Sequence, residues 1–417
     1  MFSQLIQQLS SFVARILVSL ISLLLSVIIV RLYTKDIVGD FFLLTSYSTV
    51  LAQVFLFGMA PVLNIMSSKG VQLNKIVIEI AKKNVISMLC MFLCGLIILA
   101  FFAKVDYSSL IVLSLLSGVL LIISELMKGQ GMYILSQIFN GGLNNILFLI
   151  LIVVFIPNKE ETDLEDIIYF YALAYMCVIV GGSIYLRIKY KVSKSKGLID
   201  DVITYSIILP IFISTVIVYM FSQIDLWFVS RLFDNDVVAQ YGLAIRLTAV
   251  LSFSTLSVRA IAAARIPKLM NDIQALQKDV SLSCLFSFLV SLVILSGIAL
   301  FGKLFIGLVY GNSYELTWYV LLIFSFGQMI NAATGPCDYL LSHTGHGRYL
   351  MIISLVSFLF LMTLLAIITI RFNSVFLFCG AVSFTICLQN LIIMYVAFKK
   401  TGVLSLPLIN FKRAYVS

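Results

Sequence analysis

Long apolar runs recur along the whole chain, and they constrain its fold more than any other feature. A helix rises 1.5 Å per residue, so a run of about 20 apolar residues crosses about 30 Å of hydrocarbon. Of the 417 residues, 61% are hydrophobic and 11% are charged. A soluble domain carries about 25% charged residues, because water must wet its surface. The sequence therefore predicts an all-α membrane protein with lipid as its main solvent.

Reading for these runs predicts twelve transmembrane helices. They cover residues 12–30, 41–66, 84–103, 110–127, 132–156, 167–186, 203–230, 238–264, 280–302, 315–341, 349–370 and 375–397. Eighteen Lys and Arg residues fall on one side of these spans, seven on the other and three inside them. The positive-inside rule then places both termini in the cytoplasm, an N-in/C-in topology. Topology also accounts for the net charge of +9, so no nucleic-acid partner is expected.

The basic segment between the sixth and seventh spans divides the chain into two halves. We predict an N-terminal six-helix lobe, a basic cytoplasmic loop, a C-terminal six-helix lobe and a cytoplasmic tail. These parts cover residues 1–186, 187–202, 203–397 and 398–417.

An internal repeat supports this division. Shifting the sequence by 200 residues aligns 30–51 with 230–251, and seven of the 22 positions are identical. Six helices separate the copies, so the two lobes would be parallel, with the same orientation in the membrane. Parallel repeats of this kind are typical of alternating-access carriers, in which the substrate binds between the lobes. The alternative is that any two helix–turn–helix hairpins look alike.

Ionisable side chains inside the spans are the candidate functional residues, because a charge in hydrocarbon is costly and usually faces a cavity or a partner. Arg15 and Arg259 lie toward the cytoplasmic ends of their spans, where they either snorkel to the interface or face a cavity. Glu125 ends the fourth span three residues before Lys128, either as a boundary ion pair or as part of a site.

Asp225 and Arg246 stand on the two arms of one hairpin, at about equal depth, on the order of 10 Å below the outer surface. They would form a structural ion pair or a functional pair, in which Arg246 faces an anionic substrate and Asp225 tunes its release or binds a coupling cation. Asp338 follows Gly335 and Pro336 in span ten and is a third acidic candidate. Pro210 and Pro336 are predicted to interrupt their helices, as happens where transporters bend.

Signals for an enzyme are weak. The chain has two histidines and seven cysteines, and none of them has the spacing of a metal site. We therefore predict no catalytic residue, no metal and no resident cofactor, with a proton or a sodium ion left open as a coupling cation.

Two stretches resemble a known family. The run R-L-Y-T-K-D-I-V-G-D-F at 31–41 is similar to the turn after helix one in polysaccharide-repeat (O-antigen) flippases. The run from Gln223 to Leu247 is similar to the start of their second lobe, with Ala239 in place of the usual glycine. These flippases belong to the multidrug/oligosaccharidyl-lipid/polysaccharide exporter superfamily.

The resemblance implies a carrier that moves an undecaprenyl-diphosphate-linked oligosaccharide across a bacterial inner membrane during lipopolysaccharide biosynthesis. Membrane lipid and polysaccharide-assembly proteins would be its other partners. Arg15, Arg246 and Arg259 would offset the diphosphate charge in a central cavity. Asp225, Glu125 and Asp338 would serve as coupling or ion-pair residues.

Two other functions compete with this interpretation. A cation-coupled multidrug exporter of the same fold should have a cavity lined by carboxylates, whereas here the arginines outnumber them. An O-antigen polymerase should have a large external loop that carries catalytic residues, and the longest clear external loop is the ten residues 157–166.

Overall fold

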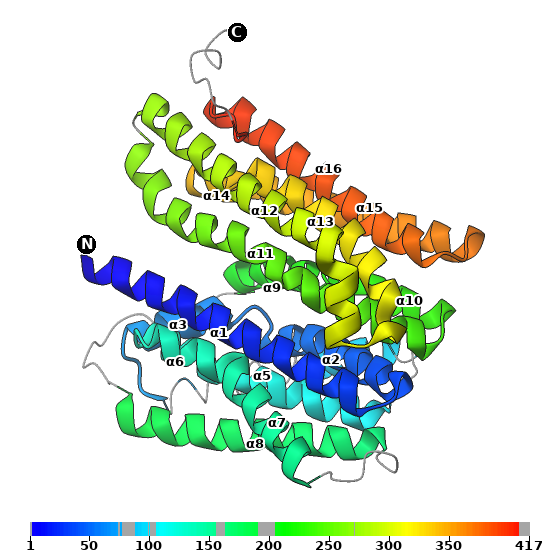
Figure 1. Ribbon diagram of the computed structural model, residues 1–417. Helices are drawn as coiled ribbons and strands as arrows, with labels where there is room; N and C mark the ends of the chain where they lie inside the picture. Colours follow the sequence, from blue (N-terminus) through cyan, green and yellow to red (C-terminus); the bar gives the residue numbers. More distant parts are fainter. Residues whose placement is uncertain are drawn as a thin grey trace. The chain divides into compact units, whose positions relative to one another are not determined.

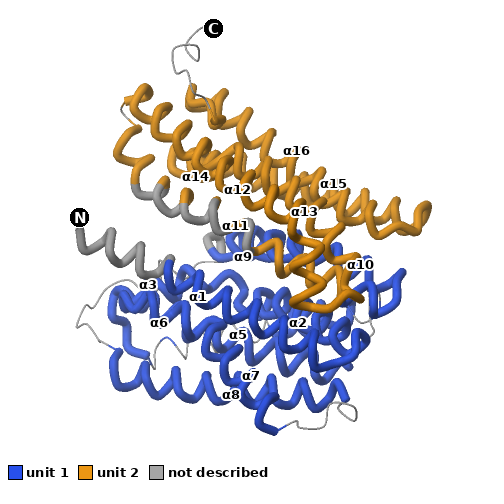
Figure 2. The backbone as a smooth tube through the Cα atoms, viewed as in Figure 1, with its two compact units in different colours: residues 1–239 blue, residues 240–417 orange. Residues whose placement is uncertain are grey.

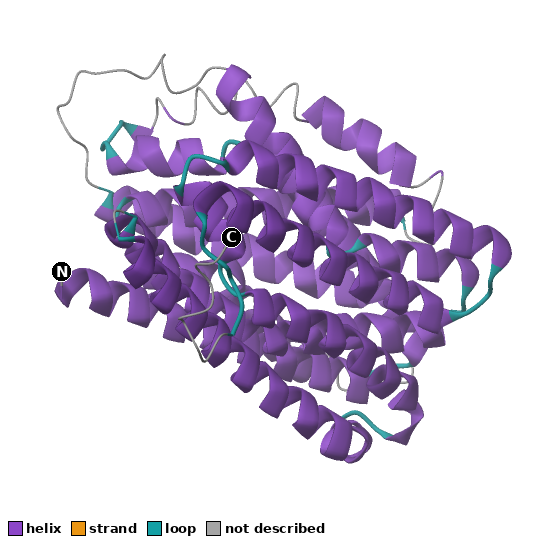
Figure 3. Ribbon diagram, turned by 90° about the horizontal axis from the view of Figure 1, so that it is seen from above, coloured by secondary structure: helices purple, strands orange, loops and turns teal. Residues whose placement is uncertain are grey.

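The computed structural model describes residues 2–73, 76, 88–98, 100, 106–155, 163–190, 205–270 and 272–407. Over these ranges the chain consists of helices joined by short loops, without a strand (Figure 3). The α-helices are labelled in Figure 1. The elements are α1 (Phe2–Leu32), α2 (Lys35–Leu56), α3 (Ala60–Ser68), α5 (Tyr107–Gly129), α6 (Tyr133–Gln137), the π-helical turn η1 (Ile138–Gly142), α7 (Leu143–Phe155), α8 (Leu164–Lys189), α9 (Tyr205–Phe221), α10 (Ile224–Leu232), α11 (Asn235–Leu269), α12 (Ile273–Val309), the 3₁₀ turn η2 (Asn312–Tyr314), α13 (Glu315–Thr334), α14 (Cys337–His343), α15 (Gly347–Arg371) and α16 (Val375–Thr401).

Each of the twelve predicted spans falls at least partly on helix in the described ranges. Nine helical segments there are long and apolar enough to cross a bilayer, and the bent pair α9–α10 makes a tenth. The prediction of an all-helical, multi-pass membrane protein is confirmed. The count of twelve and the N-in/C-in topology stay predictions.

Several spans are broken, and the prolines explain only some of the breaks. Pro336 stands between α13 and α14, as predicted. The prediction for Pro210 is wrong, since α9 continues through it. A proline so near the described start of a helix removes only one early hydrogen bond. The 45° bend of this span comes instead after Phe221, between α9 and α10.

The chain forms two compact units, Met1–Ala239 and Gln240–Ser417 (Figure 2). Each unit has its own apolar core. In the first, Leu63, Met127 and Ile208 bring α3, α5 and α9 together. In the second, the core joins α11, α12, α14 and α16 through residues such as Cys284 and Leu340. The predicted lobe boundary at 187–202 lies mostly outside the described residues and stays a prediction.

The two copies of the sequence repeat have the same local structure, at the predicted offset of 200 residues. In the first copy, one helix ends at Leu32 and the next begins at Lys35. In the second copy, one helix ends at Leu232 and the next begins at Asn235.

The start of α11 packs against the start of α2, which explains why the first unit extends to Ala239. Lys35 forms an ion pair with Asp236, and the Asn235 amide donates to the Asp40 carboxylate at 3.0 Å. At Gly39 the backbones approach so closely that an added Cβ would lie 2.6 Å from the Asn235 carbonyl oxygen. Only a residue without a side chain allows this approach.

Candidate functional site: a polar cluster in each unit

The first unit carries a polar cluster around Arg15, near the start of the apolar segment Val13–Leu32. The exposed Arg15 side chain donates from Nε to Gln137 Oε1 of α6 at 3.4 Å. Tyr219 of α9 lies within electrostatic reach of both Arg15 and Glu125. None of the described carboxylates forms an ion pair with Arg15. Among the described side chains, the one that accepts a hydrogen bond from Arg15 is therefore a neutral amide and not a carboxylate.

Glu125 is neutralised by a neighbour on its own helix. It forms an ion pair with Lys128, one turn later on α5, and both side chains are mostly buried. This is the pairing that their spacing predicts. Because the lysine takes up the charge of Glu125, this carboxylate does not offset Arg15.

The turn η1 brings Gln137 to this cluster. Gly141 leaves helical geometry there, with φ 166° and ψ −26°. The following Gly142 lets α1 approach, because an added Cβ would lie 3.0 Å from the side chain of Val18. Single π-helical turns are frequent at functional sites. Here the turn sets α6 against the face of α1 that carries Arg15.

Three neutral side chains of the first unit each bury an oxygen that has no hydrogen-bond partner among the described residues. These oxygens are Oγ of Ser48 on α2, Oδ1 of Asn144 on α7 and the hydroxyl of Tyr33. Tyr33 lies in the turn between α1 and α2, where burial and, to a smaller extent, the charge of Asp166 raise its pKa to about 12. Its phenol is therefore neutral at physiological pH.

The second unit carries a polar cluster around Arg259 of α11, in which Arg259 Nε and Asp338 Oδ1 are buried without a hydrogen-bond partner among the described residues. The Arg259 Nε lies 3.4 Å from Asp338 Oδ2, and its Nη2 donates to Asn331 Oδ1 at 3.1 Å. The Asn331 amide in turn donates to Gln328 Oε1 at 3.1 Å. Both charged side chains are a little over one-fifth exposed. Two residues that the sequence offered as separate candidates, Arg259 and Asp338, thus form an ion pair.

The break between α13 and α14 places Asp338 against Arg259. Gly335 has a positive φ of 58°, and Pro336 follows it without a backbone N–H. An added Cβ at Gly335 would lie 2.5 Å from Cys284 Sγ, so α12 closes tightly over the break. Asp338 then falls in the first turn of α14, where the helix dipole favours a negative charge.

Asp225 and Arg246, the predicted cross-hairpin pair, belong to different units. Asp225 is 2% exposed, in the first turn of α10, and Arg246 is half-buried on α11. Each makes interactions of its own within the protein. Their pairing with each other stays a prediction.

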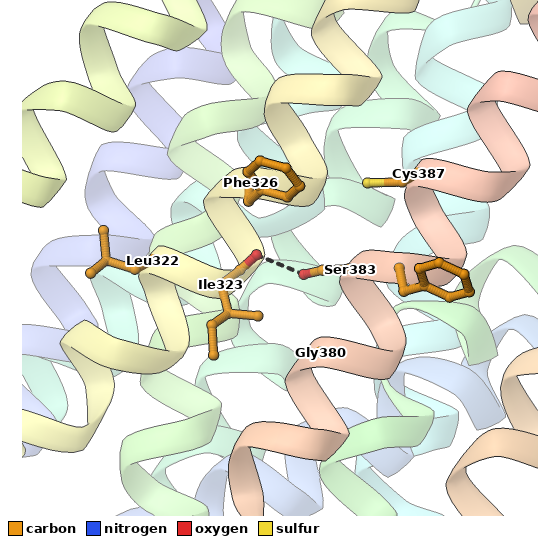
Figure 4. A pocket seen from close by; sticks show the side chains of 7 residues that line it. Leu322, Ile323, Phe326, Gly380, Ser383 and Cys387 are labelled. Carbon is orange, nitrogen blue, oxygen red and sulfur yellow. Dashed lines mark hydrogen bonds between the residues drawn. The ribbon is translucent and has the colours of Figure 1, made fainter.

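The second unit also has an apolar pocket of about 500 Å³ between α13 and α16 (Figure 4). Phe326 and Phe384, 55% and 57% exposed, stand at its open side. Ser383 supplies its only hydroxyl, which already donates to the Ile323 carbonyl at 2.7 Å. This pocket suits hydrocarbon rather than an anion, so it is not the predicted cationic cavity.

Sequence reasoning missed the neutral members of both clusters. Gln137 begins a polar stretch, Q-I-F-N-G-G-L-N-N, inside an apolar span, and that stretch was the available signal. Asn331 and Gln328 stand one turn apart on α13. Among the described residues, no group of three or more His, Cys, Asp and Glu side chains could hold a metal ion.

Comparisons with known proteins bear on this arrangement. A family model described as MatE matches residues 210–368. A crystal structure of MATE in complex with MaL6 is 13% identical, has a TM-score of 0.63 and covers 95% of each chain. An outward-facing multidrug resistance MATE family transporter of the MOP superfamily is 13% identical, with a TM-score of 0.63, covering 95% of this chain and 93% of that chain.

A third match is the lipid II flippase MurJ in an inward closed conformation. It is 14% identical, has a TM-score of 0.63 and covers 94% of this chain and 87% of that chain. The chain has a MATE-like fold. A search of curated proteins finds no match. At these identities the matches establish the MATE-like fold and leave the substrate open, since this fold carries both drugs and lipid II in the matched proteins.

Proposed function

We propose that this chain is a flippase that moves an undecaprenyl-diphosphate-linked oligosaccharide, an O-antigen repeat unit, from the cytoplasmic to the periplasmic leaflet. The observation that carries the proposal is Arg15, an exposed arginine in an apolar span whose charge no described carboxylate neutralises. An unneutralised guanidinium at low dielectric binds a phosphate oxygen strongly, through charge-assisted and often bidentate hydrogen bonds. A diphosphate headgroup is an anion of this kind.

The remaining charged residues take roles around that step. Arg246 and Arg259 would contact the diphosphate together with Arg15. Asp225, Glu125 and Asp338 would act as ion-pair partners or would bind a coupling proton or sodium ion. The lipid tail would remain in hydrocarbon, and the two lobes would expose the site to each leaflet in turn.

This proposal places the protein in a bacterial inner membrane, where it would work with polysaccharide-assembly proteins. The likeness to the lipid II flippase supports a lipid-linked substrate.

A cation-coupled multidrug exporter is the second candidate. The matched multidrug transporters favour it, and so does the almost fully buried Asp225. Such a carrier would use a carboxylate to bind a cationic drug or its coupling ion. An O-antigen polymerase is a weaker alternative, because the matched structures are a flippase and transporters.

Complementation separates these functions. We expect the wild-type gene to restore surface polysaccharide in a flippase-deficient strain, and the Arg246→Ala variant to fail while it accumulates normally in the membrane. The conservative variant Arg246→Lys is the matched control and should retain part of the activity. Full activity of Arg246→Ala would remove this residue from the mechanism. Drug resistance conferred without polysaccharide export would replace the flippase by the exporter.

A further inference from the structure

The segment that follows α16 turns back into the core of the second unit. Gly402 ends the helix with a positive φ of 72°. After it, Val403 and Ser405 are completely buried, although this stretch has no regular secondary structure. We call residues 402–406 the strap. Buried irregular backbone needs partners for its polar groups, and the strap finds them on α12 and α13.

The side chain of Gln277 on α12 forms hydrogen bonds with both the backbone N–H and the backbone carbonyl of Leu404 in the strap. Its Oε1 accepts from the Leu404 amide at 2.7 Å, and its Nε2 donates to the Leu404 carbonyl at 2.8 Å. Gln277 is 2% exposed, and its amide also donates to Ser281. Without the strap this buried side chain would lose two of these three bonds, and such groups are costly to leave unpaired.

Ser405 connects the strap to the break between α13 and α14. Its hydroxyl donates to the carbonyl of Thr334 at 2.5 Å and lies 3.4 Å from Cys284 Sγ. Thr334 is the last residue of α13, and the last carbonyls of a helix have no partner within it. Ser405 therefore caps α13 from outside, at the point where the helix breaks.

The strap also reaches the far side of the break. Val403 belongs to the same buried apolar cluster as Leu340 and Leu341 of α14. Gly335 and Pro336 make the break a joint, because neither continues the helical hydrogen bonding of α13. A segment bonded to the helix before a joint and packed with the helix after it fixes the angle of that joint. Asp338, and with it the ion pair to Arg259, lies directly beyond.

We propose that the strap is a latch on the α13–α14 joint, and that it must leave Thr334 and Gln277 for the joint to bend during the transport cycle. Gln277 and Ser405 are then positioning residues, which act on Arg259 and Asp338 through the angle of α14. This step rests on the proposed transport function but not on the identity of the cargo.

A reversible cross-link tests the latch. Ser405→Cys would place a thiol opposite the native Cys284, since Ser405 Oγ now lies in contact with Cys284 Sγ at 3.4 Å. Copper phenanthroline with oxygen takes up the two thiol hydrogens, and dithiothreitol reverses the bond. Both the test protein and its control also carry Cys337→Ala, so that Cys284 can form a disulfide with the thiol at position 405 and not with Cys337. The matched control adds Cys284→Ala and cannot cross-link.

Two measurements on the purified full-length protein decide the outcome. In proteoliposomes with a lipid-linked oligosaccharide, we expect oxidation to slow translocation by about tenfold or more, with recovery on reduction and no change in the control. Hydrogen–deuterium exchange of the peptide 335–343 should slow by about tenfold when the strap is locked, with or without any substrate.

The exchange measurement keeps the latch separate from the proposed function. Slower exchange without any translocation in either form would support the latch and remove the flippase. Unchanged exchange in the cross-linked protein would overturn the latch, and so would translocation at the rate of the reduced form.

Discussion

Arg15 of the first unit donates to the neutral amide of Gln137, whereas Arg259 of the second unit faces the carboxylate of Asp338 and donates to Asn331. Both arginines lie on helices that the sequence assigns to the membrane. They differ in the side chain that contacts the guanidinium. A guanidinium held only by an amide remains a binding site for an anion, while one paired with a carboxylate is already neutral as a pair.

We therefore propose different roles for the two clusters. In the proposed function, Arg15 of the first unit is the arginine that binds a charged ligand, and the nearby Glu125 forms its ion pair with Lys128. In the second unit, Arg259 already forms an ion pair with Asp338, directly beyond the break between α13 and α14. A ligand anion would have to displace Asp338 before it could bind Arg259 fully. Three predictions test whether the comparison holds.

The largest effect is expected at Arg15. We predict that Arg15→Gln lowers the rate of substrate translocation by about 100-fold, equivalent to about 2.7 kcal/mol, because the substrate loses a charge-assisted contact at low dielectric. Arg15→Lys should keep part of the rate, since it retains the charge and loses the forked geometry. Initial rates in proteoliposomes measure the effect, alongside the thermal unfolding temperature, which should stay unchanged.

Arg265→Gln is the control for Arg15. This arginine is 61% exposed and pairs with Asp279 outside the two clusters, so its loss should change the translocation rate less than about twofold. Equal effects at Arg15 and Arg265 would mean that Arg15 acts as an ordinary surface charge, and the contrast between the units would disappear.

At Arg259 we expect a loss of stability instead. Arg259→Met should lower the free energy of unfolding by about 2 kcal/mol, because it leaves Asp338 mostly buried without its charge partner. Removing both charges, in Arg259→Met with Asp338→Leu, should cost less than the single change, since no unpaired charge is then left. Denaturant titration in detergent micelles gives these free energies.

The double variant is the decisive sample in that series. The loss of unfolding free energy in the double variant is compared with the losses in Arg259→Met alone and in Asp338→Leu alone. If it equals their sum, the two residues do not interact and their ion pair does not stabilise the second cluster. Lys303→Met serves as the exposed reference, because Lys303 and its partner Glu315 are 58% and 48% exposed, and it should leave the free energy of unfolding almost unchanged.

The sequence predicts the fold well because lipid imposes a simple requirement. Every stretch in hydrocarbon must satisfy its own backbone, so a long apolar run is expected to be helical, and each of the twelve predicted runs falls at least partly on helix where the structure describes it. The repeat was visible for the same kind of reason. Its two hairpins carry Arg31 and Arg231, and Asp36 and Asp236, at equal positions, and their helix ends match at the 200-residue offset.

The sites were less predictable, because their contacts are set by irregular backbone. Gln137, which contacts Arg15, lies directly before the π-helical turn η1. A π-helical turn produces no regular spacing of apolar residues by which the sequence could predict it. Asp338 lies against Arg259 because Gly335 adopts a positive φ. The sequence predicts that the helix breaks at Gly335 and Pro336, but it does not predict the direction that the chain takes after the break. The intramembrane charges could be chosen from the sequence, but their partners could not.

The smallest expected effect concerns the two hairpin copies, which differ at one tight position. The first copy has Gly39, and the second has Ala239 at the equivalent place. Gly39→Ala makes the copies alike there and puts a methyl group 2.6 Å from the Asn235 carbonyl oxygen. Because that neighbour is backbone, the start of α11 must move away, and we expect a net loss of about 1 kcal/mol in unfolding free energy.

Gly181→Ala separates this steric effect from helix propensity. Gly181 lies inside α8, and an added Cβ there meets no atom within 4 Å. Alanine gains about 0.5–1 kcal/mol over glycine in a helix, so this control should be neutral or slightly stabilising in the same titration. If Gly39→Ala behaves like Gly181→Ala, the approach at Gly39 does not constrain the hairpins. If instead it destabilises, the ion pair of Lys35 with Asp236 should weaken with it, because both contacts depend on α11 lying against α2.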